Sequence, residues 1–275
     1  MTNPALLVNI PAIGCSDRRP SLSCCLKLLV LILFIPTLGF PQTQVESKAY
    51  NWADIKPAKD ENRIRRQYLD GSTTLLNNLE IHTSTVETGE APHPPHTHED
   101  QEELVIVKEG SLKATIRDQS KILGPGSVIY ILPREEHGFV NAGTTPCTYF
   151  IIKLKTGSVL SSDKIPASFM VDWNEMKFVP HDKGGRRDVV DKRTVLFERF
   201  EMHVTTLNAG LSSHEPHTHS PEEIILMKEG DAEMIVGEKK VKVSEGGLVF
   251  LDSKVSHNLT NVGGKPVTYF AFQWN

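Results

Sequence analysis

Two short histidine-rich segments carry the residues best suited to chemistry. HPPHTH, which ends at His98, and HEPHTH, which ends at His219, each place three histidines within six residues, and the whole chain has eleven. His96 and His98 are two positions apart, as are His217 and His219. Residues two apart on a β-strand point to the same side, so each pair can bind one metal ion.

Further ligand types follow each pair at matched distances. A pair of glutamates comes a few residues later, at Glu102-Glu103 and Glu222-Glu223, and one more histidine ends a later apolar run, at His137 and His257. Three imidazoles and one carboxylate make a donor set that suits Mn, Fe, Ni, Cu or Zn. Such a set leaves coordination positions open for water or substrate.

The histidine segments belong to a longer duplication. His96 and His217 are 121 positions apart, and at the same offset LEIHTSTVETG aligns with FEMHVTTLNAG and Trp52 with Trp173. After the histidines the offset is 120, because the first copy has one extra residue there. The period is too long for a solenoid repeat and indicates two copies of a domain. The predicted domains are residues 42–155 (the first copy) and 171–275 (the second copy), joined by a linker at 156–170.

Short strands are expected throughout both copies. ELVIVKEG, SLKATIR and SVIYIL in the first copy, and AEMIV, KVKV and LVFLD in the second, are rich in β-branched or aromatic residues and are separated by Gly, Pro or Asn. Closely spaced short strands are typical of an all-β sandwich or barrel. We therefore predict an all-β protein.

The N-terminus has a different character. An apolar run, LKLLVLILFIPTLGF, follows Arg18 and Arg19. It is shorter than the roughly 20 residues that span a bilayer and is typical of a secretory signal peptide. Residues 1–41 are thus expected to be a signal peptide or, alternatively, an uncleaved anchor, which predicts a secreted or periplasmic protein. Cleavage would leave Cys147 as the one cysteine, so no internal disulfide could form.

The spacing of these residues resembles the two motifs of the cupin superfamily, Gly-x5-His-x-His-x3-4-Glu-x6-Gly and Gly-x5-Pro-x-Gly-x2-His-x3-Asn. The resemblance implies two tandem cupin barrels, of the double-stranded β-helix or jelly-roll type, each able to hold a divalent metal. It also selects the second glutamate of each pair. The implied metal ligands are His96, His98, Glu103 and His137 in the first copy, and His217, His219, Glu223 and His257 in the second.

The chain departs from the second motif at the turn before the last histidine. The motif's Pro and Gly are Leu132 and Arg134 in the first copy, and Asp252 and Lys254 in the second. The turn is therefore expected to differ, while the ligands are kept.

Other repeated residues are further candidates. His93 and His214 are candidate acid–base groups at the mouth of each site, with a surface-loop position as the alternative. Strand alternation predicts that the Glu80–His82 and Glu201–His203 pairs lie outside the barrels, and that Glu102 and Glu222 are exposed. Lys153 aligns with Gln273, so the two sites differ, and we expect the second to bind metal more tightly.

The net charge of −4, with no basic excess, argues against a nucleic-acid partner. The resemblance implies an exported metalloenzyme of the dioxygenase, decarboxylase or isomerase type, acting on a small oxygen-rich molecule. The alternative is a metal-dependent protein that binds a sugar or a small acid without catalysis. The expected partner is a small-molecule ligand or substrate. Membrane contact is expected only through an uncleaved N-terminus, and a homodimer is an open alternative.

Overall fold

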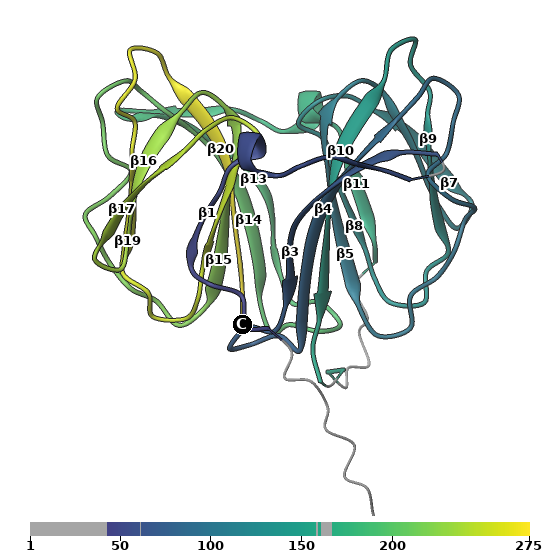
Figure 1. The fold of residues 1–275 in the computed structure, drawn as a ribbon, viewed down its shortest axis with the longest axis horizontal. Helices are drawn as coiled ribbons and strands as arrows, with labels where there is room; N and C mark the ends of the chain where they lie inside the picture. Colours follow the sequence, from purple (N-terminus) through teal and green to yellow (C-terminus); the bar gives the residue numbers. More distant parts are fainter. Residues whose placement is uncertain (1–42, 61, 158, 161–166) are drawn as a thin grey trace, which may run out of the picture. The chain divides into compact units, whose positions relative to one another are not determined.

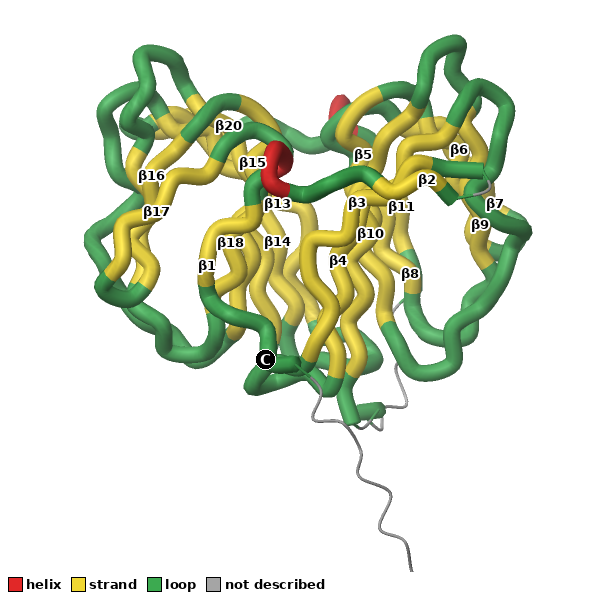
Figure 2. The backbone as a smooth tube through the Cα atoms, in the orientation of Figure 1, coloured by secondary structure: helices red, strands yellow, loops and turns green. Residues whose placement is uncertain are grey.

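A computed structural model describes residues 43–60, 62–157, 159–160 and 167–275, and these fall in one compact unit. The described residues form twenty strands and two short 3-10 turns, so the prediction of an all-β protein is confirmed (Figures 1 and 2). The predicted signal segment lies outside the described residues. Within those residues, no helix has the length and apolar character needed to cross a membrane.

Each copy contributes a seven-stranded and a three-stranded sheet. The first copy's large sheet has the order β11 (Phe169–Val171), β8 (Val128–Ile131), β5 (Glu102–Glu109), β10 (Cys147–Lys155), β4 (Asn78–Val86), β3 (Ile64–Gly71) and β2 (Ala58–Lys59). Its small sheet has the order β7 (Gln119–Leu123), β6 (Leu112–Ile116) and β9 (His137–Asn141).

The second copy repeats this plan. Its large sheet has the order β1 (Lys48–Tyr50), β18 (Leu248–Leu251), β15 (Glu222–Glu229), β20 (Val267–Trp274), β14 (Phe200–Leu207), β13 (Gly184–Lys192) and β12 (Val179–His181). Its small sheet has the order β17 (Lys239–Val243), β16 (Ala232–Val236) and β19 (His257–Thr260). The two 3-10 turns are η1 (Trp52–Asp54) and η2 (Trp173–Glu175).

The two copies exchange their first strands. β1 precedes the first copy in sequence but pairs with β18 of the second, and β11 precedes the second copy but pairs with β8 of the first (Figure 1). The turns that follow make the same exchange, because Trp52 packs over Gly246 and Trp173 over Gly126. A Cβ at these glycines would lie 3.2 and 2.4 Å from the indole rings. The domain limits at residues 155 and 171 stay a prediction from the repeat, since three-dimensional contacts cross them.

A shared core joins the copies. One cluster of buried apolar side chains includes Leu79 and Ile81 of the first copy together with Met202 and Phe272 of the second. Two further clusters are each confined to one copy. Each large sheet therefore packs apolar side chains on both faces, one toward its own small sheet and one toward the other copy.

Two buried carboxylates add polar links across this shared core, and the prediction that they are exposed is wrong. Glu102 is fully buried and accepts hydrogen bonds from the backbone of Val195 and Leu196, at 2.8 and 3.0 Å, and from the hydroxyl of Tyr130. Burial raises the pKa of Glu102. The two backbone donors come from the other copy, which strand alternation within one copy does not reveal.

Glu222 of the second copy makes the equivalent contacts with the first copy. It accepts from Thr73 Oγ1 at 2.7 Å, from the amide of Leu75 at 2.8 Å and from Trp274 Nε1 at 3.1 Å. Burial raises the pKa of Glu222 to about 7. The reciprocal pair follows from the duplication, because each copy presents the same loop to the same glutamate of the other.

Candidate metal centres

Backbone pairing places the first and last histidine of each set opposite each other. His96 and His137 exchange two backbone hydrogen bonds, at 3.0 and 2.9 Å, and His217 and His257 do the same at 3.2 and 3.0 Å. Directly paired antiparallel residues project their side chains to the same side. The pairing therefore brings together histidines that are about forty positions apart in the sequence.

The second histidine of each set is fixed by the turn that departs from the family motif. The amide of Arg134 donates to the carbonyl of His98, and that of Lys254 to the carbonyl of His219, both at 2.7 Å. Arg134 and Lys254 have φ of 66° and 64°, the left-handed conformation for which the motif's glycine is suited. Both turns thus place a residue other than glycine in this conformation, and a difference from the family's turn stays a prediction.

The side chains of each set converge. One ring nitrogen each from His96, His98 and His137 lie within 4.8 Å of one another, and the same holds for His217, His219 and His257. Such distances are compatible with metal–ligand bonds of about 2.0 to 2.3 Å to a common ion.

Both selected glutamates face these clusters. Glu103 lies 3.2 Å from Nε2 of His98 and 3.8 Å from Nε2 of His137. Glu223 lies 3.2 and 3.1 Å from Nε2 of His219 and His257. The structure thus brings together all eight predicted ligand residues, four in each copy, and their binding of metal stays a prediction.

The hydrogen bonding of the last histidines fits a bound metal. Nδ1 of His137 lies 2.9 Å from the carbonyl of Glu135, and Nδ1 of His257 lies 2.8 Å from that of Val255. A carbonyl only accepts, so the proton sits on Nδ1 and the Nε2 lone pair faces the cluster. Both Nε2 atoms are buried and make no hydrogen bond with any described residue. Buried imidazole nitrogens left unpaired in this way suit a metal that accepts their lone pairs.

The electrostatics also favour metal ligation. Burial, together with the neighbouring imidazoles, lowers the pKa of His96 to about 4 and lowers that of His217. Burial alone raises the pKa of Glu223, but the hydrogen bond with His219 and the proximity of the His219 and His257 rings outweigh it and bring the value to about 2. At neutral pH His96 and His217 are neutral and Glu223 is ionised, which are the forms that bind cations.

His93 and His214 lie beside the clusters. Their rings contact those of His96 and His217 edge to face, with centroids 4.3 and 4.1 Å apart. His93 lines the pocket of the first copy and His214 that of the second. Both predicted acid–base candidates are therefore beside the sites, and their roles stay a prediction.

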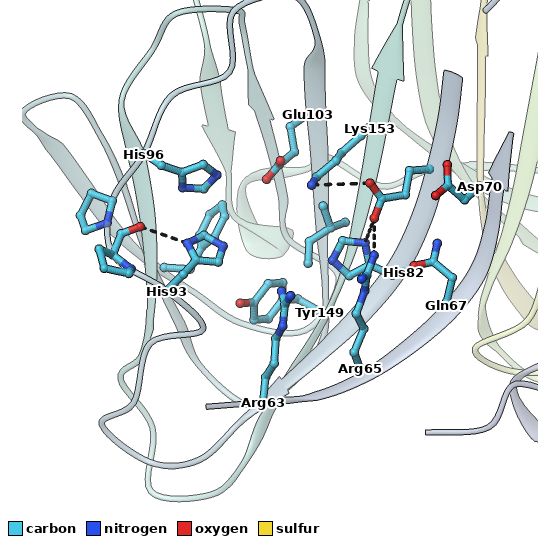
Figure 3. A pocket seen from close by; sticks show the side chains of 15 residues that line it. Arg63, Arg65, Gln67, Asp70, His82, His93, His96, Glu103, Tyr149 and Lys153 are labelled. Carbon is cyan, nitrogen blue, oxygen red and sulfur yellow. Dashed lines mark hydrogen bonds and ion pairs between the residues drawn. The ribbon is translucent and has the colours of Figure 1, made fainter. Parts of the chain in front are cut away.

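The pocket of the first copy contains a pair that the sequence placed outside. The pocket has a volume of about 690 Å³, and Glu80 and His82 line it (Figure 3). Glu80 contacts His82 Nδ1 at 3.0 Å, Lys153 Nζ at 3.6 Å and Arg65. Burial raises the pKa of Glu80, but the bond to His82 and the charges of Lys153 and Arg65 prevail and lower it to about 2.

This correction has a simple cause. Leu79 and Ile81, which alternate with the pair on β4, pack in the core shared with the other copy. The apolar face of the strand is therefore the outer one, and the polar face lines the pocket. The equivalent pair of the second copy, Glu201 and His203, has the same arrangement, with a 2.8 Å contact between the two side chains. His203 lines the pocket of the second copy, which is smaller, at about 330 Å³.

Among the pocket residues of the first copy that received no role from the sequence are Arg63, Arg65 and Tyr149. Arg65 aligns with Arg186 and Tyr149 with Tyr269, so their repetition was a usable signal. Arg63 aligns with Gly184 and carried no such signal.

The fold and the two histidine clusters define a cupin with two domains. The cupin domain family model matches residues 82–153 and 203–272, just over half of the chain, so the chain belongs to this family. No curated protein matches the chain.

Solved structures with two cupin domains share the fold. Protein Ylba from E. coli is 16% identical, with a TM-score of 0.67 over 82% of this chain and 90% of that chain. AerE from Microcystis aeruginosa is 18% identical, with a TM-score of 0.63 over 80% of this chain and 97% of that chain. Oxalate decarboxylase from Lactobacillus farciminis, in a formate complex, is 14% identical, with a TM-score of 0.65 over 86% of this chain and 88% of that chain. At these identities the likeness concerns the fold alone.

Proposed function

We propose that the protein is an exported metalloenzyme with two cupin domains that acts on a small oxygen-rich molecule. One observation carries this proposal: the buried Nε2 atoms of His137 and His257 make no hydrogen bond with the described residues. Each of these atoms faces a carboxylate and two further histidines. The four ligand residues of each copy would hold one divalent transition metal: Mn, Fe, Ni, Cu or Zn. The bound ion would supply a Lewis acid or a redox centre.

The residues around the clusters support catalysis. His93 and His214 are placed to move protons next to the ligands, with ring centroids less than 4.5 Å from His96 and His217. In the first copy His82 lines the pocket with its Nδ1 3.0 Å from Glu80, and it provides a second group on the pocket wall that can carry a proton. A protein that only bound its ligand would need no such groups, which favours the enzyme over the binding module.

Decarboxylation is one reaction to test, beside dioxygenation and isomerisation, because a protein of this fold is an oxalate decarboxylase. The test begins with the metal content of the purified chain. A screen of small dicarboxylates, uronates and catechols follows, with oxygen uptake and carbon dioxide release recorded. Turnover that disappears in His98→Ala or His219→Ala supports the enzyme. Ligand binding that depends on metal, without turnover of any compound, supports the binding module.

Export is part of the proposal and has its own test. The apolar run at residues 26–40, preceded by two arginines, supports it. Expression of the full chain in a Gram-negative host, followed by mass spectrometry of the periplasmic fraction, should find an N-terminus near Gln42. Full-length chain in that fraction would instead indicate an uncleaved anchor.

A further inference from the structure

The pocket of the first copy holds one cation, Arg63, whose carboxylate partner lies outside the pocket lining. Its charged lining consists of Arg63, Arg65, Lys153, Asp70, Glu80 and Glu103. Arg65 and Lys153 both contact Glu80, and Glu103 faces the histidine cluster. Asp70 accepts a hydrogen bond from Asn78 at 2.8 Å. Arg63 alone has no carboxylate of the pocket lining as its partner.

The contacts of Arg63 are weak for a buried guanidinium. Its side chain is 17% exposed, and it reaches Ser84 Oγ and Asp60 Oδ2 only at 3.4 Å. Asp60 lies at the surface with 56% of its side chain exposed, where an ion pair is worth little. Nε of Arg63 is buried and makes no hydrogen bond with any described residue. A buried cation with unused donors is costly unless an anion completes it.

A second unused donor lies nearby. The side chain of Tyr149 is fully buried and lines the same pocket, and its hydroxyl makes no well-formed hydrogen bond with the described residues; its neighbour is the hydroxyl of Ser84, which Arg63 also reaches. In the view of Figure 3, the guanidinium of Arg63 and the ring of Tyr149 lie on the same side of the pocket, away from Lys153. A guanidinium and a hydroxyl together suit the oxygens of a carboxylate.

The second copy keeps the tyrosine, as Tyr269, but has no counterpart of Arg63. Gly184 takes the place of Arg63, and an added Cβ there would lie 2.1 Å from the carbonyl oxygen of Thr206, so no side chain fits. Gln273 takes the place of Lys153 and donates to Glu201 at 3.0 Å. Its remaining pocket cations are engaged, since Arg186 binds Asp188 and Glu201, and Lys183 donates to two backbone carbonyls.

We propose that the first copy alone binds an anionic substrate, a small carboxylic acid whose carboxylate accepts hydrogen bonds from Arg63 and Tyr149. The other end of the acid then points to the histidine cluster in the same pocket. The inference rests on the proposed metalloenzyme function and names its substrate class. It also assigns substrate binding to one copy, whereas the ligand sets are present in both.

Calorimetric titration of the full protein with sodium malonate tests this assignment. The wild type should bind one malonate per chain, and malonamide, which has the same shape without charge, should not bind. Arg63→Gln should weaken malonate binding at least about tenfold, since a charge-assisted hydrogen bond is lost. Tyr149→Phe should weaken it less, and Arg63→Lys, which keeps the charge, should recover part of the affinity.

The control is Arg193→Gln, which removes an equal charge from an exposed ion pair of the second copy. It should bind malonate as the wild type does. Two malonates per chain, or equal losses in the Arg63 and Arg193 variants, would overturn the assignment. Thermal melting excludes unfolding as the cause, and Arg63→Lys provides a second folded variant if Arg63→Gln melts early.

Metal analysis of the same samples separates this inference from the proposed function. Protein that holds metal but binds malonate independently of Arg63 contradicts the anion subsite alone. Protein without metal that binds malonate through Arg63 contradicts the metalloenzyme and keeps the subsite.

Discussion

Replacing Glu102 by alanine should destabilise the whole protein, although the residue lies outside both ligand sets. The substitution removes the acceptor for two backbone amides of the other copy and for the Tyr130 hydroxyl. A buried donor left unsatisfied costs about 1–3 kcal/mol. Water entering the cavity recovers part of this, so a total loss of about 3–5 kcal/mol is expected. That is a large share of the 5–15 kcal/mol of a typical domain.

Glutamine at the same position provides the matched control. Glu102→Gln keeps one oxygen for the amides of Val195 and Leu196, and its NH2 group can donate to the hydroxyl oxygen of Tyr130. We expect a loss of about 1 kcal/mol. Because the copies share a core, both variants should unfold in one transition.

Urea unfolding followed by tryptophan fluorescence, together with thermal melting, measures both losses. For a chain of this size about 3–5 kcal/mol corresponds to a fall in Tm of roughly 6–20 °C. An alanine variant as stable as the glutamine variant would refute the reasoning, because the acceptor would then contribute nothing. Two separate transitions in the wild type would refute the claim of a shared core.

Other perturbations test the remaining parts of the structure. If the free metal concentration is a hundred times its Kd, removing the metal with a chelator should lower the free energy of unfolding by about 2.7 kcal/mol. Thermal melting should show this loss as a lower Tm. His219→Ala should lose more metal than His98→Ala, because Glu223 lies closer to its histidines than Glu103 and the second site has the neutral Gln273 where the first has Lys153. Lys254→Gly should stabilise the protein by about 1 kcal/mol in urea unfolding, since glycine adopts a φ of 64° without strain, whereas Ser253→Gly should not. Burial raises the pKa of Cys147 to about 12, so at pH 8 iodoacetamide should label its peptide in mass spectrometry only after unfolding.

The strands and the convergence of the histidines could be predicted because local patterns and the repeat encode them. Residues that favour β-strands alternate or cluster between turn residues in the segments SLKATIR and AEMIV. The structure forms strands β6 and β16 at these segments. The HxH spacing puts two imidazoles on one side of the chain wherever the backbone is extended. A duplication provides each pattern twice, which separates signal from coincidence.

The burial of the glutamates could not be read from the sequence. Alternation on β4 shows two faces, and the apolar face with Leu79 and Ile81 was assigned to the inside. The second copy covers that face, so Glu80 and His82 turn into the pocket instead. Glu102 receives its donors from Val195 and its neighbour, more than ninety positions away, and no local pattern carries such a contact.

The exchanged strands were equally hidden. β1 and β11 have only three residues each, too few for a periodic pattern. Their pairing with the opposite copy is decided by packing, such as the indole of Trp52 on Gly246, rather than by any preference of the strand itself.

Metal stoichiometry of matched variants tests the central claim most directly. Inductively coupled plasma mass spectrometry should find two divalent ions per wild-type chain, one in His137→Ala, one in His257→Ala and none in the double variant. The melting curves should show all four proteins folded. A wild type without metal, or a double variant that keeps the wild-type content, would contradict the assignment of His137 and His257 as ligands of two metal centres.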